Sequence, residues 1–216
     1  MVEHPHVVLL GDSILDNGAY TRGAPDVLTH LRRSLPNDWR ATLCAVDGAT
    51  SRGLASQLKC VPPDATHLVI ATGGNDALEN SDLLSMPVRS SAEALEAFAH
   101  RLATFERGYR NAIREALALR RPTIVCTIYN GALDPARATI ARVGVALFND
   151  VILRTAMELG LDVLELRAVC TEPADYANPI EPSDQGGLKI ARAIARVIGA
   201  ANDADAKATR LWGAAD

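Results

Sequence analysis

The chain has 216 residues, enough for one domain that buries a substantial core without disulfides or metals. Apolar residues make up 48% of it and charged residues 22%, which is the composition of an ordinary globular protein. The formal net charge of -4, with Lys and Arg scattered along the chain, argues against binding to nucleic acid or to an anionic membrane.

The predicted elements alternate between short β-branched runs and longer helical stretches, which indicates a mainly parallel sheet covered by helices on both faces. Five strands are predicted, over residues 7–10, 41–46, 67–72, 123–128 and 162–165. Helices are predicted over residues 25–34, 51–59, 91–120, 136–159 and 185–198. Ser91 is the expected N-cap of the long third helix, and Gly144 weakens the prediction in the middle of the fourth.

No internal repeat, low-complexity block or linker divides the chain, so residues 1–200 are predicted to form a single domain. Residues 201–216 are polar and rich in alanine and are predicted to be a C-terminal tail, whose end Trp212 would dock on the domain.

The spacing of the cysteines and the first apolar run indicate where in the cell the protein is located. Cys44, Cys60, Cys126 and Cys170 show neither close pairing nor metal-ligand spacing, so buried reduced thiols are expected. No apolar stretch is long enough to span a bilayer. The first apolar run leads directly into a glycine turn, which is typical of a core strand and not of a signal peptide. A cytoplasmic protein is therefore expected.

Three loops that directly follow predicted strands carry unusual residues, and ligands of parallel sheets bind at this end of the strands. The first loop reads Gly-Asp-Ser-Ile-Leu-Asp over residues 11–16. Gly11 permits a tight turn, after which Ser13 can present its hydroxyl beside backbone N–H groups. Because residue 15 is leucine, the loop is not the Gly-x-Ser-x-Gly elbow of the α/β-hydrolases. Taken alone, it is better explained by Ser13 capping a helix.

The second and third loops each have a functional and an ordinary interpretation. In the second, residues 47–51, Gly48 could offer its N–H to an oxyanion, but a turn before a helix capped by Thr50 or Ser51 explains it equally well. In the third, residues 72–76, Asn75 could donate its amide into the same cleft, but Asn/Asp turns are common.

Together, and in this order, the three loops resemble the SGNH hydrolase superfamily, the GDSL-type esterases and lipases. The resemblance extends from residue 7 to about residue 198. It implies a three-layer α/β/α flavodoxin-like fold and hydrolysis of a carboxylic ester, with no cofactor and no metal. It also implies that Ser13 is the nucleophile and that the oxyanion hole consists of the Ser13 N–H, the Gly48 N–H and the Asn75 side chain. Supporting roles at this site are expected of the nearby carboxylates Asp12, Asp16 and Asp76.

The fourth sequence block departs from the family pattern. Family members read Asp-x-x-His-Pro-Thr-x-x-Gly before the last helix, whereas residues 178–187 here read Asn-Pro-Ile-Glu-Pro-Ser-Asp-Gln-Gly-Gly. Glu181 therefore stands at the histidine position and Asn178 at the aspartate position. None of the five histidines is expected to compensate, because they lie before the first strand, at the amino end of the third or on helices; they are His4, His6, His30, His67 and His100.

Three interpretations of this departure stay open. In the first, Glu181 replaces the histidine as the base and Asn178 donates to it, since a carboxylate base needs a donor where imidazole needs an acceptor. Burial would then have to raise the pKa of Glu181, which is about 4.3 for a free glutamate. In the second, the site is catalytically impaired and the fold serves binding or interaction.

In the third interpretation, the acidic residues of the loops hold a cation; these are Asp12, Asp16, Asp76 and Glu181. No known ligand spacing matches this set, and hydrogen bonds within turns explain Asp12 and Asp16 equally well.

The paired substitution favours the first interpretation, and the expected partner is a small-molecule ester. Residues 129–133, after the fourth strand, are expected to shape its pocket. The acyl group, the alcohol and the oligomeric state are not determined by the sequence.

Overall fold

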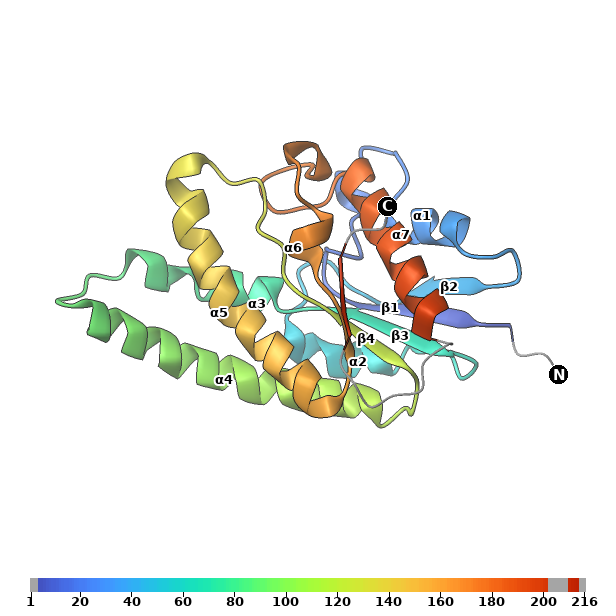
Figure 1. Cartoon of the computed structure of the whole chain (residues 1–216), viewed down its shortest axis with the longest axis horizontal. Coiled ribbons are helices and arrows are strands. Elements are labelled where there is room, and N and C mark those ends of the chain that lie inside the picture. The colour runs from blue at the N-terminus through green and yellow to red at the C-terminus, as the bar shows by residue number, and fades with distance from the viewer. Residues whose placement is uncertain (1–3, 202–209, 214–216) are drawn as a thin grey trace.

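The computed structural model describes residues 4–201 and 210–213. Its centre is a parallel sheet with the strand order β2-β1-β3-β4-β5-β6 (Figure 1). The strands are β1 (His6–Gly11), β2 (Arg40–Leu43), β3 (His67–Ala71), β4 (Thr123–Cys126), β5 (Asp162–Leu164) and β6 (Leu211–Trp212). In this flavodoxin-like order, the chain reverses direction across the sheet between β1 and β3, and ligands bind outside the carboxyl ends of such a strand pair.

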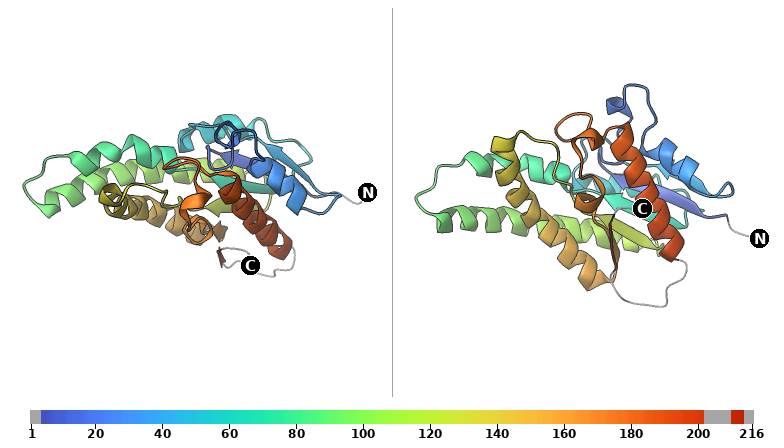
Figure 2. Two further views of the ribbon diagram at one scale, coloured as in Figure 1. Left: turned by 90° about the horizontal axis from the view of Figure 1, so that it is seen from above. Right: turned by 45° about the horizontal axis from the view of Figure 1, so that its top comes forward.

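Helices pack around the sheet in a three-layer arrangement (Figures 1 and 2). The α-helices are α1 (Val27–Ser34), α2 (Leu54–Leu58), α3 (Gly74–Glu79), α4 (Ser91–Leu117), α5 (Pro135–Leu159), α6 (Leu166–Val169) and α7 (Asp184–Ala201). Short 3-10 helices are η1 (Gly18–Tyr20), η2 (Ser51–Gly53), η3 (Ser81–Ser85) and η4 (Pro173–Asp175).

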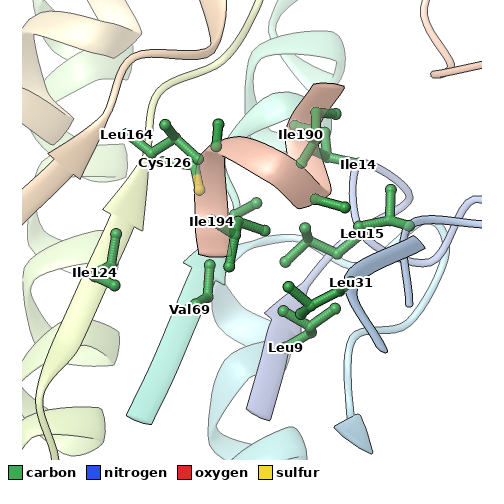
Figure 3. Packing of buried hydrophobic residues seen from close by; sticks show 14 of the residues in the cluster. Leu9, Ile14, Leu15, Leu31, Val69, Ile124, Cys126, Leu164, Ile190 and Ile194 are labelled. Carbon is green, nitrogen blue, oxygen red and sulfur yellow. The ribbon is translucent and has the colours of Figure 1, made fainter. Parts of the chain in front are cut away.

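Two apolar clusters hold the layers together, one on each face of the sheet. Side chains alternate along β1, so that Leu9 packs with α1, α6 and α7, while Leu10 packs with α2, α4 and α5. Figure 3 shows the first cluster, in which Ile190 and Ile194 of α7 face the strands. Every residue of β1 is buried. This two-sided burial explains why the strand reads as a continuous apolar run.

The structure confirms the α/β fold and changes several details. The sheet has six strands and not five, because Leu211 and Trp212, within the predicted tail, pair with β5. The rest of that tail, residues 202–209 and 214–216, lies outside the described residues. Gly144 does not interrupt α5. The predicted strands over 41–46, 67–72 and 123–128 end earlier, because the chain leaves the sheet for the loops.

Two further corrections concern single residues. The cap of α4 is Ser90 and not Ser91, since extended Ser90 accepts a hydrogen bond from the Glu93 N–H at 3.2 Å. Three of the four free cysteines are buried as expected, but Cys60 lies exposed in the turn that follows α2. Among the described residues, no helix is long and apolar enough to cross a membrane.

Candidate active site

The end of β1 is fixed by close contact with β3. Gly11 has a φ of +127°, and a Cβ atom there would stand 1.7 Å from the Ala71 carbonyl oxygen, so that only glycine fits. Because β2 is short, no strand pairs with the other side of Gly11. The Gln57 side chain takes most of this place: its Oε1 accepts from the Gly11 N–H at 2.7 Å, and its Nε2 donates to the Gly11 carbonyl at 2.7 Å. The Val46 N–H, in the loop after β2, also donates to the Gly11 carbonyl, at 3.1 Å.

Ser13 lies in the turn that follows. The Leu15 and Asp16 N–H groups donate to the Asp12 carbonyl at 3.1 and 3.0 Å, and the Ile14 N–H donates to Asp12 Oδ1 at 3.1 Å. The side chain of Asp12, and not that of Ser13, therefore holds the turn. No helix follows directly, so the helix-cap interpretation of Ser13 is wrong. Within the described residues, the Ser13 N–H has no hydrogen-bond partner.

Two of the carboxylates for which supporting roles were expected, Asp16 and Asp76, bond to the loop after β2. Asp16 Oδ2 accepts from the Asp47 N–H at 2.9 Å. The Asp76 carboxylate accepts from both the N–H and the hydroxyl of Ser51, at 2.8 and 2.7 Å. Ser51 is thereby occupied and does not cap the helix, and Thr50 makes no side-chain cap bond either. The loops after β1, β2 and β3 thus form one connected unit.

The predicted oxyanion donors belong to this unit. Gly48 has a φ of +77°, and its N–H forms no hydrogen bond with any described residue. Asn75 donates one amide hydrogen to the Ala49 carbonyl at 2.9 Å, which orients the side chain and leaves its second hydrogen available. Asn75 lies beside Ser13 in the lining of one cavity, whereas Gly48 does not line that cavity.

Glu181 reaches the same cavity from the loop before α7, and only 7% of its surface is exposed. Asn178 shapes this loop, since its Oδ1 accepts from the N–H groups of Ile180 and Glu181 at 2.9 Å each. Tyr129 donates its hydroxyl to the Ile180 carbonyl at 2.5 Å. Asn178 itself is exposed and contacts the Glu181 backbone. A bond from its amide to the Glu181 carboxylate is not formed among the described residues and stays a prediction.

A buried asparagine that the sequence did not single out links the two loops that carry Ser13 and Glu181. Asn17 is fully buried, accepts from the Val27 N–H at 2.9 Å and donates to the Pro182 carbonyl at 3.2 Å. It therefore ties the segment after Ser13 to the residue after Glu181. A buried asparagine has no local pattern that distinguishes it from one in a surface loop.

Burial controls the protonation of the two carboxyl groups beside Ser13. Burial raises the pKa of Glu181, an interaction with the Ser13 hydroxyl lowers it, and the negative charge of Asp47 raises it further. Burial also raises the pKa of Asp12, to about 8, against the opposing Ile14 hydrogen bond; the charges of Glu181 and Asp76 add to the rise. Asp12 Oδ2 and Glu181 Oε2 are buried without a hydrogen-bond partner among the described residues.

A cavity of about 140 Å³ opens beside Ser13. Its polar wall includes Asp12, Ser13, Asn75 and Glu181. The remaining wall is mostly apolar and comes chiefly from α3, η3, α4, α5 and the segment after β4. That segment supplies four of the residues predicted to shape the pocket, Tyr129, Asn130, Gly131 and Leu133. Asp16, Asp76 and Asn178 lie outside this lining and act on the loops around it.

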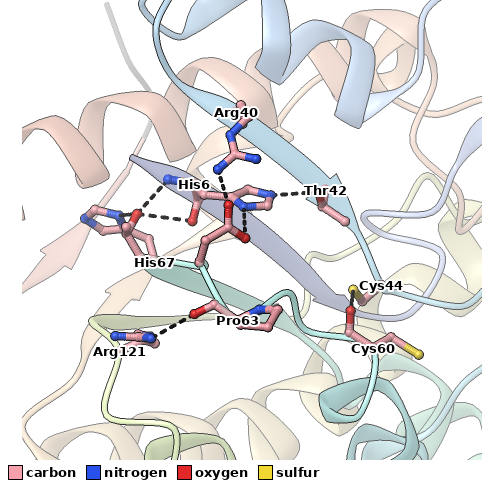
Figure 4. Close-up of polar contacts among 10 residues, drawn as sticks. His6, Arg40, Thr42, Cys44, Cys60, Pro63, His67 and Arg121 are labelled. Atoms are coloured by element: carbon pink, nitrogen blue, oxygen red, sulfur yellow. Dashed lines mark hydrogen bonds and ion pairs between the residues drawn. The ribbon is translucent and has the colours of Figure 1, made fainter. Parts of the chain in front are cut away.

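None of the five histidines, all within the described residues, lines the cavity. His6 and His67 lie at the opposite, amino end of the strands (Figure 4), where His6 contacts Thr42 Oγ1 at 2.8 Å and Asp64 Oδ1 at 3.2 Å. His30 is paired with Asp184 at 2.7 Å. No described histidine is therefore placed to act as the base.

The described residues also contain no group of three or more His, Cys, Asp or Glu side chains placed to hold a metal ion. The cation interpretation required Asp16 and Asp76 to face a common centre. Both are bonded instead to donors of the loop after β2.

Known proteins resemble this chain in their family pattern and in their fold. Residues 9–187 match the GDSL-like lipase/acylhydrolase family. None of the curated proteins matches the chain.

Among solved structures, an extracellular lipase from Streptomyces rimosus is similar at 16% identity, with a TM-score of 0.65 over 91% of this chain and 99% of that one. A phospholipase A1 from Streptomyces albidoflavus has 15% identity and a TM-score of 0.65 over 91% and 99% of the two chains. An acetylxylan esterase from Geobacillus stearothermophilus has 20% identity and a TM-score of 0.64 over 92% and 97%. At these identities the likeness shows the fold alone.

Proposed function

Since the chain belongs to the GDSL-like lipase/acylhydrolase family, we propose that it hydrolyses carboxylic esters through an acyl-enzyme formed on Ser13. The observation that carries the proposal is the meeting of Ser13 and Glu181 at one cavity, where the serine hydroxyl interacts with the carboxylate. The two residues come from opposite ends of the chain, so this meeting follows from the fold and not from a local turn.

Glu181 is proposed to accept the Ser13 proton while the serine oxygen attacks the ester carbonyl carbon. The protonated Glu181 then returns the proton to the leaving alcohol, and the acyl group stays on Ser13. In the second half, Glu181 deprotonates a water molecule that attacks the acyl carbon. It then returns this proton to the Ser13 oxygen as the bond between that oxygen and the acyl carbon breaks, which releases the carboxylic acid and restores Ser13. Burial of Glu181 assists both halves, because a raised pKa makes the carboxylate a stronger base.

The negative charge that forms on the carbonyl oxygen needs donors close by. The N–H groups of Ser13 and Gly48, which have no partner in the part of the chain that the structure describes, and the second amide hydrogen of Asn75 are proposed to supply them. The nearby Asp12 side chain is compatible with an oxyanion at this place, because its pKa of about 8 leaves it largely protonated at pH 7. A second full negative charge beside the oxyanion is thereby avoided.

Covalent labelling tests the proposal. A fluorophosphonate probe is expected to modify the wild-type protein at Ser13, and Ser13→Ala is expected to abolish both the labelling and the turnover of p-nitrophenyl butyrate. Glu181→Gln keeps the size of the side chain but removes its basicity, so turnover is expected to fall by roughly 100-fold or more. Glu96→Gln, at an exposed position of α4, is the matched control and is expected to leave turnover unchanged.

Two results contradict the proposal in different ways. Full turnover by Glu181→Gln excludes the carboxylate base. A folded wild-type protein with neither labelling nor turnover supports instead a catalytically impaired protein that uses the cavity for binding or interaction.

A further inference from the structure

We propose that the cavity beside Ser13 binds the acyl chain of the ester and selects an unbranched chain of about six carbon atoms over an acetyl group. This inference rests on the proposed function and specifies its substrate.

The chemistry of the wall divides by element. The polar groups that would act on the ester come from loops at the sheet edge. Leu84 of η3, Phe98 of α4 and Phe148 of α5 supply apolar surface from helices that extend beyond the sheet (Figure 1). An ester whose carbonyl lies at Ser13 would therefore direct one substituent along an apolar wall. An aliphatic chain fits this wall, whereas a sugar or another polyhydroxylated group would place most of its hydroxyls against apolar side chains.

Asn80 also lines the cavity, but its polar atoms are used elsewhere. Its Nδ2 donates to the Asp76 carbonyl at 2.8 Å, and its Oδ1 accepts from Arg101 at 2.9 Å. One Nδ2 hydrogen and the Oδ1 atom of Asn80 are therefore engaged within the protein. Its second amide hydrogen, Ser81 and Asn130 are the few polar groups of this part of the wall, which is otherwise apolar.

The size of the cavity sets the chain length. Its volume is about 140 Å³. An engineered apolar cavity of about 150 Å³ holds a benzene ring, which has six carbon atoms. An acetyl group would leave most of this space unfilled and its lining atoms without contacts. Each buried methylene is expected to raise kcat/KM by up to about fourfold until the space is full.

Gly144 keeps this space open. It lies in the middle of α5, where glycine is unfavourable compared with alanine, yet it is buried and lines the cavity. A Cβ atom at this position would meet Leu84 Cδ2 at 3.6 Å, an ordinary contact distance. Alanine is therefore accommodated, while the rest of a larger side chain has to occupy the cavity. Gly144 is thus proposed as the residue that determines acyl-chain length.

The test is a series of p-nitrophenyl esters with acetyl, butyryl, hexanoyl, octanoyl and dodecanoyl groups. For the wild-type protein, kcat/KM is expected to rise at least tenfold from acetate to hexanoate and not to rise further by dodecanoate. Gly144→Leu is expected to lower the hexanoate-to-acetate ratio at least tenfold, and Gly144→Ala to lower it less. Gly108→Leu is the matched control: it also replaces a helical glycine, its Cβ has no atom within 4 Å, and it lies outside this cavity, so the ratio is expected to stay unchanged.

The outcomes separate this inference from the proposed function. Equal or better turnover of acetate by the wild type, or an unchanged ratio in folded Gly144→Leu or Gly144→Ala, overturns the acyl-chain assignment and leaves ester hydrolysis intact. Absence of turnover and of Ser13 labelling contradicts the proposed function. Calorimetry with hexanamide and acetamide then still decides the chain-length question. Preferential hexanamide binding that Gly144→Leu abolishes supports the assignment, and no preference overturns it.

Discussion

The carboxyl groups of Glu181 and Asp12 share a small buried volume with Ser13, so that the charge of one affects the proton affinity of the other. Asp47 adds a negative charge that acts on Glu181 from the loop after β2. The protonation of Glu181, and with it the proposed base catalysis, is therefore set first by burial and then adjusted by the Ser13 hydroxyl and the Asp47 charge.

Asp47→Asn tests this influence. Removing the Asp47 charge is expected to lower the pKa of Glu181, because one cause of its rise disappears. The acidic limb of the pH profile of kcat/KM should then move to lower pH, since Glu181 acts as a base only when it is deprotonated. Asp38→Asn, at an exposed position near the start of β2, is the control and should leave the limb in place. A limb that does not move in Asp47→Asn contradicts Glu181 as the titrating group.

Asn75 is expected to act in the transition state and not in ground-state binding. Asn75→Ala should lower kcat by on the order of 100- to 1000-fold with a smaller change in KM. Asn75→Asp should be more harmful still, because it places a carboxylate where negative charge develops. Steady-state kinetics on p-nitrophenyl butyrate provides the measurement, and an effect confined to KM would make Asn75 a substrate-binding residue.

At the residue scale, the motif residues of the site could be predicted from the sequence, but the residues that hydrogen-bond to their loops could not. The Gly-Asp-Ser and Gly-Gly-Asn-Asp blocks are contiguous and visible along the chain. Asn17 and Gln57 were missed because their partners lie 165 and 46 residues away along the chain. Asn178 could be aligned to a family position, but its hydrogen bonds depend on the path of the loop.

At the scale of elements, the helices that carry the site begin at particular residues. Helix α3 starts inside the Gly-Gly-Asn-Asp block, where a turn but no helix was predicted. Six residues are too few to show helical periodicity, so the sequence could not reveal it. Helix α4 was expected, but the two adjacent serines could not be ranked as caps without backbone angles.

The cap of α4 provides a prediction with an internal control. Ser90→Ala should destabilise the protein by about 1 kcal/mol, because the Glu93 N–H loses its acceptor. Ser91→Ala, one residue into the helix and exposed, should have little effect or stabilise slightly. The midpoints of urea denaturation measure both changes. The reverse ranking would restore Ser91 as the cap.

For the whole molecule, the buried carboxyl of Asp12 makes the free energy of unfolding depend on pH. Unfolding exposes Asp12 and returns its pKa from about 8 to the model-compound value of 3.8. The folded state thus favours the protonated form. This contribution to stability is fully present below pH 4 and is lost as the pH rises towards 8.

Asp12→Asn should therefore gain stability relative to the wild type as the pH increases. The difference in Tm between Asp12→Asn and the wild type is expected to move in favour of the variant between pH 5 and pH 9, whatever its value at pH 5. Thermal unfolding followed by circular dichroism measures it. A difference that is independent of pH would show that Asp12 does not titrate in this range.

The fold class and the parallel sheet could be predicted for the whole molecule because alternating apolar runs and amphipathic helices are local patterns. The sixth strand could not, since the two residues of β6 pair with a strand almost 50 residues earlier in the chain. Cytoplasmic location stays a prediction.

The contact between Gln57 and Gly11 has a kinetic consequence. Amide hydrogens in the middle of β1 are bonded to neighbouring strands and should exchange with deuterium only when the sheet opens. The Gly11 amide is bonded to a side chain from α2, a helix of five residues, so its exchange requires only that this helix detach. It should exchange faster than the amide of Leu9, and Gln57→Ala should accelerate it alone. The end of β1 next to Ser13 would then open locally without opening of the middle of the strand.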